Sequence, residues 1–429
     1  MSESLSVYWG LFLNACAPLE LSLNYCSHNC AYCFANLNSP DRTADVAQVM
    51  GLLANYQTKQ TFAARLLREK YPVTISNHVD AFSESNWRLS LPLIEALTDQ
   101  GIPIVFQTKG GTGDREAMKM TPPSVWYISI ETLDPAISKR IASGAPLPKE
   151  RLKLIEDLRS HGHRVVVGIN PAVEDWIDDP KELCRQLKEA GCEATWIQPL
   201  HLSNNQIKNL GDRESAALGE SVLGKARKMR RDVSNMRIYH ACREASLEYG
   251  MDTYDLGQPQ RSDFFKPYKE TYKKTFPVLQ DFINHCWDTG KGANDPIYFK
   301  EFADFVLPSL PEGVFPLRNH IGAVQFQYFW KEWDSKIPKN MDYRTLLQWC
   351  WEVNSIIYNP VNSHAFCWAA KKVDKFNPDT HFSPIDPMTK IQKGKEDTIW
   401  ELYTDDDGLP ILLFRPSTEK YMCGEWDAW

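Results

Sequence analysis

Three cysteines that lie within eight residues carry the clearest chemical signal in this sequence. Cys26, Cys30 and Cys33 follow the spacing C-x3-C-x2-C, whereas the other eight of the 11 cysteines form no CxxC pair. Three thiolates in one short loop can ligate three irons of a four-iron cluster (4Fe–4S), which leaves one iron without a protein ligand. That iron can bind the amino and carboxylate groups of S-adenosylmethionine, and an electron from the cluster then yields a 5′-deoxyadenosyl radical.

The residues alone leave two alternatives open for the cysteine group. His28 lies between the cysteines and could complete a structural zinc site, in which case the chain would be a zinc-stabilised binding protein without radical catalysis. The three cysteines could also be inert residues of a core. Zinc sites usually pair two groups of ligands, and the sequence offers no second group, so we favour the iron–sulfur cluster.

The composition is that of an ordinary folded protein and excludes several function classes. The 429 residues carry a net charge of −7, with 24% charged and 43% hydrophobic residues, which argues against disorder and against a chain-wide nucleic-acid surface. No uncharged apolar run approaches the roughly 20 residues that cross a membrane. No Lys or Arg precedes Arg42, so a secretory signal is not expected. We therefore predict a cytoplasmic protein without a membrane segment, whose cysteines bind metal rather than form disulfides.

Alternating strand and helix patterns surround the cysteines. Strands are predicted at 19–25, 72–76, 102–108, 125–130, 164–169 and 194–200, and helices at 44–70, 91–100, 149–161 and 180–190. About six β/α units in 200 residues indicate parallel strands with helices packed outside, as a barrel or a doubly wound sheet. In both arrangements ligands gather at the carboxyl ends of the strands. The cysteines directly follow the first strand and therefore lie at that edge.

The character of the chain changes after the β/α units. A helical pattern covers 212–250, and nine of the 14 tryptophans lie beyond about residue 285, where 398–404 and 409–414 are predicted to pair as a hairpin. We predict a core barrel at 1–202, a helical extension at 203–290 and a Trp-rich domain at 291–429. The last would be a mixed α/β region that caps the barrel and excludes water from radicals.

In these features the sequence resembles the radical S-adenosylmethionine superfamily, including the aromatic Tyr32 before the third cysteine. The resemblance implies a partial (β/α)6 barrel. Residues 132–152, which contain Gly144-Ala-Pro and Arg151-Leu, followed by a strand ending at Pro171, are similar to the spore photoproduct lyase-like branch. Residues 76–84 resemble the TDPYQPxE segment of that branch, with Asp80 and Glu84 retained, and the resemblance extends over about residues 19–200.

The resemblance also implies roles for single residues. The cluster ligands would be the three cysteines, and the backbone at Tyr32 would contact the adenine of S-adenosylmethionine. Lys109 would hold the methionyl carboxylate as a compact point charge, and Ser129 would be a polar contact to the cofactor. Asp80 would hold the amino group, directly or through water. Glu131 could reach the ribose, although that branch usually has no acid at this position.

The substrate is the least determined part of the prediction. Spore photoproduct lyases repair a thymine dimer with a cysteine hydrogen donor downstream of the cluster, but no cysteine lies between Cys33 and Cys184 here, and Cys423 is a weak alternative. Basic stretches at 225–231 and 266–274 leave nucleic acid open as a substrate. We predict a lyase or a modification enzyme of unknown substrate, which takes electrons from a donor such as flavodoxin or ferredoxin.

Overall fold

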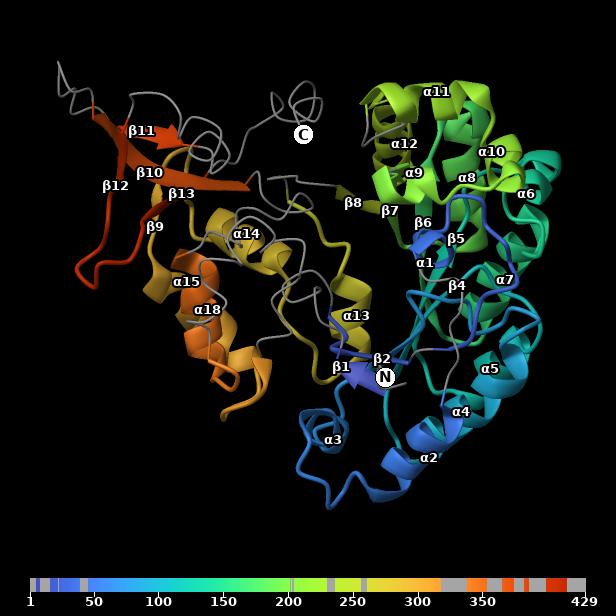
Figure 1. Cartoon of the computed structure of the whole chain (residues 1–429), viewed down its shortest axis with the longest axis horizontal. Helices are drawn as coiled ribbons and strands as arrows, with labels where there is room; N and C mark the ends of the chain where they lie inside the picture. The colour runs from blue at the N-terminus through green and yellow to red at the C-terminus, as the bar shows by residue number, and fades with distance from the viewer. Residues whose placement is uncertain are drawn as a thin grey trace.

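The protein is built from two sheets with separate sets of helices. The computed structural model describes residues 5–7, 16–21, 23–38, 45–200, 202, 204–229, 236–255, 261–317, 338–352, 365–373, 382–385 and 399–414. An eight-stranded sheet and its helices form one side of the molecule, and a five-stranded sheet with its own helices forms the other (Figure 1).

The first sheet follows the order of the sequence from one edge to the other. Its strands are β1 (Leu5–Val7), β2 (Leu19–Leu21), β3 (Val73–Ile75), β4 (Ile104–Thr108), β5 (Val125–Ser129), β6 (Arg164–Ala172), β7 (Ala194–Pro199) and β8 (Asp252–Asp255). The strands from β2 to β8 pair in parallel, and β1 joins β2 antiparallel. The predicted α/β fold with a partial barrel is thus confirmed, and the sheet stays open because β8 does not pair with β1 or β2 among the described residues.

Helices connect the parallel strands on the outside of the sheet. They are α1 (Phe34–Asn38), α2 (Val46–Asn55), α3 (Phe62–Arg68), α4 (Trp87–Asp99), α5 (Asp114–Met120), α6 (Pro135–Ile141), α7 (Pro148–Ser160), α8 (Pro180–Ala190), α9 (Asn204–Lys208), α10 (Asp212–Leu218), α11 (Glu220–Met229) and α12 (Met236–Glu248). The pattern at 44–70 forms two helices rather than one, because Thr61 caps a new helix start by accepting from the backbone N–H of Ala64. The predicted helical extension also contains β8, which extends the sheet.

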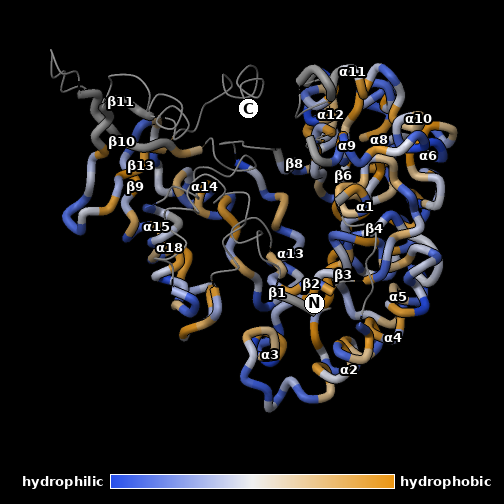
Figure 2. Tube along the Cα trace, viewed as in Figure 1, coloured by the Kyte–Doolittle hydropathy of each residue, from blue (hydrophilic) through white to orange (hydrophobic). Residues whose placement is uncertain are grey.

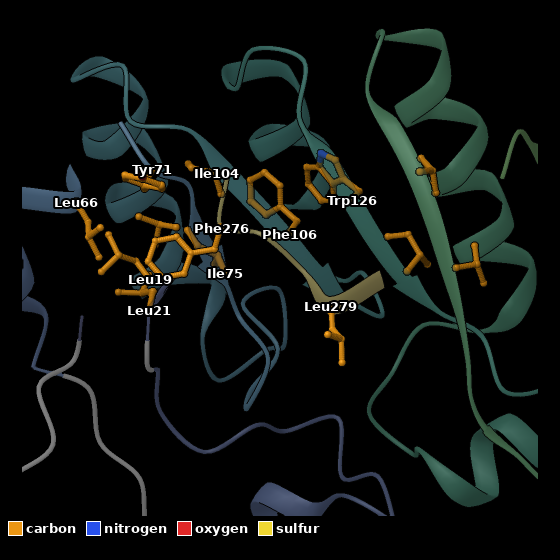
Figure 3. Close-up of a cluster of buried hydrophobic side chains, with 14 of the residues drawn as sticks. Leu19, Leu21, Leu66, Tyr71, Ile75, Ile104, Phe106, Trp126, Phe276 and Leu279 are labelled. Carbon is orange, nitrogen blue, oxygen red and sulfur yellow. The ribbon is translucent and has the colours of Figure 1, made fainter. Parts of the chain in front are cut away.

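Side chains of successive strand residues point to opposite faces of the sheet. On the outer face, Phe106 of β4 stacks on Trp126 of β5 with ring centroids 3.9 Å apart. Figure 3 shows both rings in the buried cluster, with Leu19 and Ile75 from β2 and β3 nearby. Inner-face positions of the same strands, such as Gln107, instead line a cavity. The sheet therefore has a packed outer face and a partly hollow inner face.

The C-terminal part is a mixed α/β body. Its elements are α13 (Lys266–Thr271), α14 (Leu279–Asp288), β9 (Pro296–Ile297), α15 (Phe299–Val306), α18 (Tyr343–Glu352), β10 (Phe366–Val373), β11 (Phe382–Ile385), β12 (Ile399–Leu402) and β13 (Leu412–Phe414). The predicted hairpin of 398–404 and 409–414 is confirmed at its turn, where Thr404 and Pro410 form an antiparallel bridge. Away from the turn the prediction is wrong, because β12 and β13 each pair with a different part of β10.

One hydrophobic core joins the two bodies. The ring centroids of Phe62 in α3 and Phe315 lie 4.5 Å apart, and Phe276 packs edge-on against Tyr343. Figure 2 shows hydrophobic residues concentrated along the packed elements, while the loop between α2 and α3 is hydrophilic. None of the described helices has the length and apolar character that a membrane span requires.

The buried His163 predicts a pH dependence of stability. Its Nδ1 accepts from the backbone N–H of Ser124 (3.1 Å), and its Nε2–H donates to the carbonyl of Met118 (2.9 Å). Burial lowers the pKa of His163. As the pH falls through about 6.5, the ordinary pKa of histidine, this residue therefore takes up a proton in the unfolded chain before it does so in the folded one. The free energy of unfolding should therefore fall as the pH drops from 7 to 5, by roughly 1 kcal/mol from this residue.

His163→Gln supplies the matched comparison, because an amide can keep both hydrogen bonds and does not titrate. Urea unfolding of both proteins at pH 7, 6 and 5 should give a flatter pH profile for the variant. Identical profiles would show that His163 does not contribute.

Candidate functional site

The cysteine loop leaves β2 at the carboxyl edge of the sheet and is held there by the segment after α6. The backbone N–H of Ala31 donates to the carbonyl of Ile141 (2.8 Å), and that of Gly144 donates to the carbonyl of His28 (3.0 Å). A Cβ on Gly144 would lie under 3.0 Å from the carbonyl oxygen of Ser27, closer than real Cβ atoms approach. The glycine of the Gly-Ala-Pro motif therefore lets two backbones pack directly.

One cavity of about 510 Å³ collects the three predicted cluster ligands and four predicted cofactor contacts, whereas Glu131, which was predicted to reach the ribose, is not among the residues that line it. It is lined by Cys26, Cys30, Cys33, Tyr32, Asp80, Lys109 and Ser129. These residues come from the cysteine loop, the segment after β3 and the ends of β4 and β5. Their common location follows from the parallel sheet, whose strands end at one edge. Their individual roles stay predictions.

Enclosure in this cavity affects the thiols. Loss of hydration raises the pKa of Cys26 and that of Cys30 to about 12. Both are therefore protonated at neutral pH in the metal-free protein. Metal ligation requires thiolates, so binding must release these protons.

The Asp80 carboxylate organises the loops beside the cysteines. Its Oδ1 accepts from the hydroxyl of Thr108 (2.6 Å) and the backbone N–H of Phe82 (3.0 Å), and its Oδ2 accepts from the backbone N–H of Lys109 (2.6 Å). Asp80 thus ties the segment after β3 to the end of β4. The structure adds this positioning role, and the predicted contact to the amino group of a cofactor stays a prediction.

Lys109 belongs to a buried charged group that the sequence did not predict. Its Nζ pairs with Glu131 and lies 3.0 Å from the hydroxyl of Tyr32, which donates to Glu131 Oε1 (2.5 Å). Arg151 of α7 contacts the other oxygen of Glu131 (2.8 Å). Burial lowers the pKa of Lys109 to about 8, so the amine is still mostly protonated at neutral pH. In this structure, therefore, Glu131 is a partner of Lys109.

Comparison with known proteins identifies the part of the chain that carries this cavity. Residues 21–187 match the Radical SAM superfamily. This segment is a radical SAM domain. The match includes all three cysteines and the strands from β3 to β6, whereas β7, which also lines the cavity, lies beyond it.

Similar proteins cover only parts of the chain. Uncharacterized proteins of Mycobacterium tuberculosis and Mycobacterium bovis are each 29% identical over 215 residues, which is 44% of this chain and 61% of theirs. A mutant of spore photoproduct lyase gives a TM-score of 0.41 at 12% identity, over 58% of this chain and 76% of that one. Streptococcus suis SuiB bound to S-adenosylmethionine gives a TM-score of 0.31 at 17% identity, over 42% of this chain and 40% of that one.

The cavity of the radical SAM domain fits an iron–sulfur cluster better than a single metal ion. Among the described residues, no group of three or more His, Cys, Asp or Glu is placed to hold one ion, as a zinc site would require. A cluster places its thiolate ligands on different irons, and so further apart. His28 is buried in the cysteine loop, and within the described part of the chain neither ring nitrogen has a hydrogen-bond partner. Its Nε2 lies 3.5 Å from Asp80 Oδ2. Such an imidazole suits a site that another group completes.

Further residues of the cavity were not predicted from the sequence. Glu20 of β2 is buried and accepts from His78 Nδ1 (2.8 Å), and His78 lines the cavity. In another part of the lining, Gln198 Oε1 accepts from the side chains of Asn170 (3.2 Å) and Trp196 (3.3 Å). The alternation within β7 could have assigned Trp196 and Gln198 to one face, since these two residues lie two positions apart on one strand.

The basic stretch at 266–274 has a structural function. Tyr268 and Tyr272 are buried, and the Tyr272 hydroxyl donates to the carbonyl of Ile104 (2.6 Å). Lys269 pairs with Asp281, and Lys274 lies 3.2 Å from Glu69. These aromatic rings close the inner face of the sheet instead of offering a surface for stacking bases. The side chains of the other basic stretch, 225–231, and Cys423 lie outside the described residues.

Proposed function

We propose that the protein is a radical S-adenosylmethionine enzyme whose 4Fe–4S cluster is held by Cys26, Cys30 and Cys33. The observation that carries the proposal is the position of these cysteines, inside a radical SAM domain and in one cavity with Asp80 and Lys109. When bound, the cluster and S-adenosylmethionine supply a 5′-deoxyadenosyl radical by reductive cleavage, with an electron from a donor such as flavodoxin or ferredoxin.

The residues of the chain would bind and orient the cofactor. Lys109 supplies the cation for the methionyl carboxylate, Ser129 a polar contact at the end of β5, and the Tyr32 backbone a contact to the adenine. Asp80 holds the loops on which these groups lie. The aromatic residues that line the cavity keep water away from reactive species.

The reaction acts on an unknown substrate, as a lyase or a modification enzyme. The part of the lining formed by Asn170, Trp196 and Gln198 combines uncharged amides with an aromatic ring, which suits an uncharged, hydrogen-bonding part of a substrate. Nucleic acid as the substrate, and a cytoplasmic location, stay parts of this proposal.

Anaerobic reconstitution tests the function directly. The protein is supplied with iron, sulfide, a reductant and S-adenosylmethionine, and 5′-deoxyadenosine is measured by mass spectrometry. We expect a brown protein that forms this product. A colourless protein that contains only zinc and leaves S-adenosylmethionine intact would instead support the zinc-stabilised binding protein.

A further inference from the structure

Glu131 is a fully buried carboxylate that is shared by two cations. Its two oxygens are divided between them, since Oε1 faces Lys109 and Tyr32, and Oε2 faces Arg151. Two positive charges therefore meet one negative charge in a part of the protein with little water. Asp80 is a further buried carboxylate whose charge acts on both cations.

The two cations differ in how firmly they are held. The Arg151 guanidinium is 1% exposed and also donates to the carbonyls of Ser129 (3.0 Å) and Pro146 (2.9 Å), besides approaching the Ser138 hydroxyl (3.3 Å). These contacts come from β5, α6 and the segment before α7, so the guanidinium is fixed from several sides.

Lys109 has fewer and more exchangeable contacts. Within the described part of the chain its ammonium group contacts Glu131 and the Tyr32 hydroxyl, and Lys109 lines the cavity. A lysine reaches its partners on a flexible stem, whereas the planar guanidinium makes a rigid fork. A ligand in the cavity can therefore draw Lys109 away, but not Arg151.

Separating Lys109 from Glu131 would leave a buried unpaired carboxylate if Arg151 were absent. Such a charge is strongly unfavourable in a protein interior. With Arg151 in place, Glu131 stays neutralised and keeps accepting from Tyr32. The cysteine loop that carries Tyr32 therefore need not move when Lys109 changes its partner.

We propose that Arg151 is a positioning residue that neutralises Glu131, so that Lys109 can exchange this carboxylate for the carboxylate of an amino-acid ligand. The inference rests on the proposed function, because that ligand would be the methionyl group of S-adenosylmethionine. It also gives a role to the Arg-Leu pair of the 132–152 motif, in which Arg151 had no assigned function.

Binding measurements on the reconstituted protein test the exchange. Arg151→Met leaves Glu131 with Lys109 as its only cationic partner among the described residues, so Lys109 is retained by the protein. We expect affinity for S-adenosylmethionine to fall by about tenfold or more. Affinity for decarboxylated S-adenosylmethionine, which lacks the carboxylate, should change by no more than about twofold. Isothermal titration calorimetry provides both values.

A double variant separates this effect from damage to the fold. Glu131→Gln with Arg151→Met removes both charges but keeps an amide oxygen that can accept from Tyr32, so Lys109 is released. We expect the double variant to recover most of the affinity for S-adenosylmethionine, which makes the two substitutions non-additive. Circular dichroism should show the same secondary structure in all three proteins.

The possible results are distinguishable. Loss of affinity for both ligands to the same degree in Arg151→Met, or no recovery in the double variant, would overturn the inference and leave the proposed function in place. If the wild-type protein binds neither ligand, the proposed function fails and this inference fails with it.

Discussion

Replacing any one of Cys26, Cys30 or Cys33 with alanine is expected to remove the iron–sulfur cluster and the formation of 5′-deoxyadenosine. The three thiols line one cavity, and each would hold a different iron of the cluster, so the loss of one thiol leaves an iron without its ligand. Replacing a residue that only hydrogen-bonds to a metal ligand typically lowers metal affinity or activity by roughly 10–100-fold, and we expect the loss of a ligand itself to have a larger effect. Iron and sulfide content, the absorbance of the cluster and the yield of 5′-deoxyadenosine measure the result.

Cys286 offers the matched control. It is fully buried in α14, where it belongs to the core and does not line the cavity. Cys286→Ala should lower the free energy of unfolding by about 1 kcal/mol while the cluster and the product remain. If a variant of Cys26, Cys30 or Cys33 still cleaved S-adenosylmethionine at the wild-type rate, the assignment of the cluster ligands would be wrong.

The sequence predicted the part of the site that depends on strand order. Hydrophobic alternation locates the parallel strands, and parallel strands bring their carboxyl ends to one edge. Cys30, Lys109 and Ser129 are far apart in sequence, yet each follows or ends such a strand. Their presence in one cavity therefore follows from the pattern, without knowledge of side-chain geometry.

Contacts across the edge could not be predicted in the same way. The pairing of Arg151 with Glu131 depends on how α7 is rotated against β5, and a charged residue on an amphipathic helix is usually exposed to solvent. Arg151 is instead 1% exposed. The only sequence signal was its place in the motif that resembles a known family.

The sequence pattern also could not predict which strands the short strands pair with. The turn at 405–408 has the acidic residues and glycine of a hairpin, and the backbone N–H of Gly408 does donate to the carbonyl of Asp405 (3.0 Å). Local turn chemistry cannot reveal, however, that β10 from a distant part of the chain takes both flanking strands as partners. The same holds for β8, whose four residues join the first sheet only through β7 among the described strands.

Gly144→Ala is expected to displace the cysteine loop and prevent stable binding of the cluster. The added Cβ would lie within 3.0 Å of backbone atoms of Ser27 and His28, which cannot rotate away as a side chain could. The hydrogen bond from Gly144 to His28 and the bridge between Cys30 and Ala142 hold the same contact. We expect iron content and 5′-deoxyadenosine yield to fall together, and the free energy of unfolding to decrease by about 1–3 kcal/mol.

Gly51→Ala is the comparison that isolates this close approach. Gly51 lies inside α2, and a Cβ at this position would have no heavy atom within 4 Å outside its own helix and chain neighbours. Alanine there should therefore be neutral or stabilise the helix by up to about 1 kcal/mol. Both variants add one methyl group, and they differ in whether the cysteine loop must move. If Gly144→Ala kept a full cluster and wild-type product formation, the loop would not depend on direct backbone packing, and the glycine of the Gly-Ala-Pro motif would have a different role.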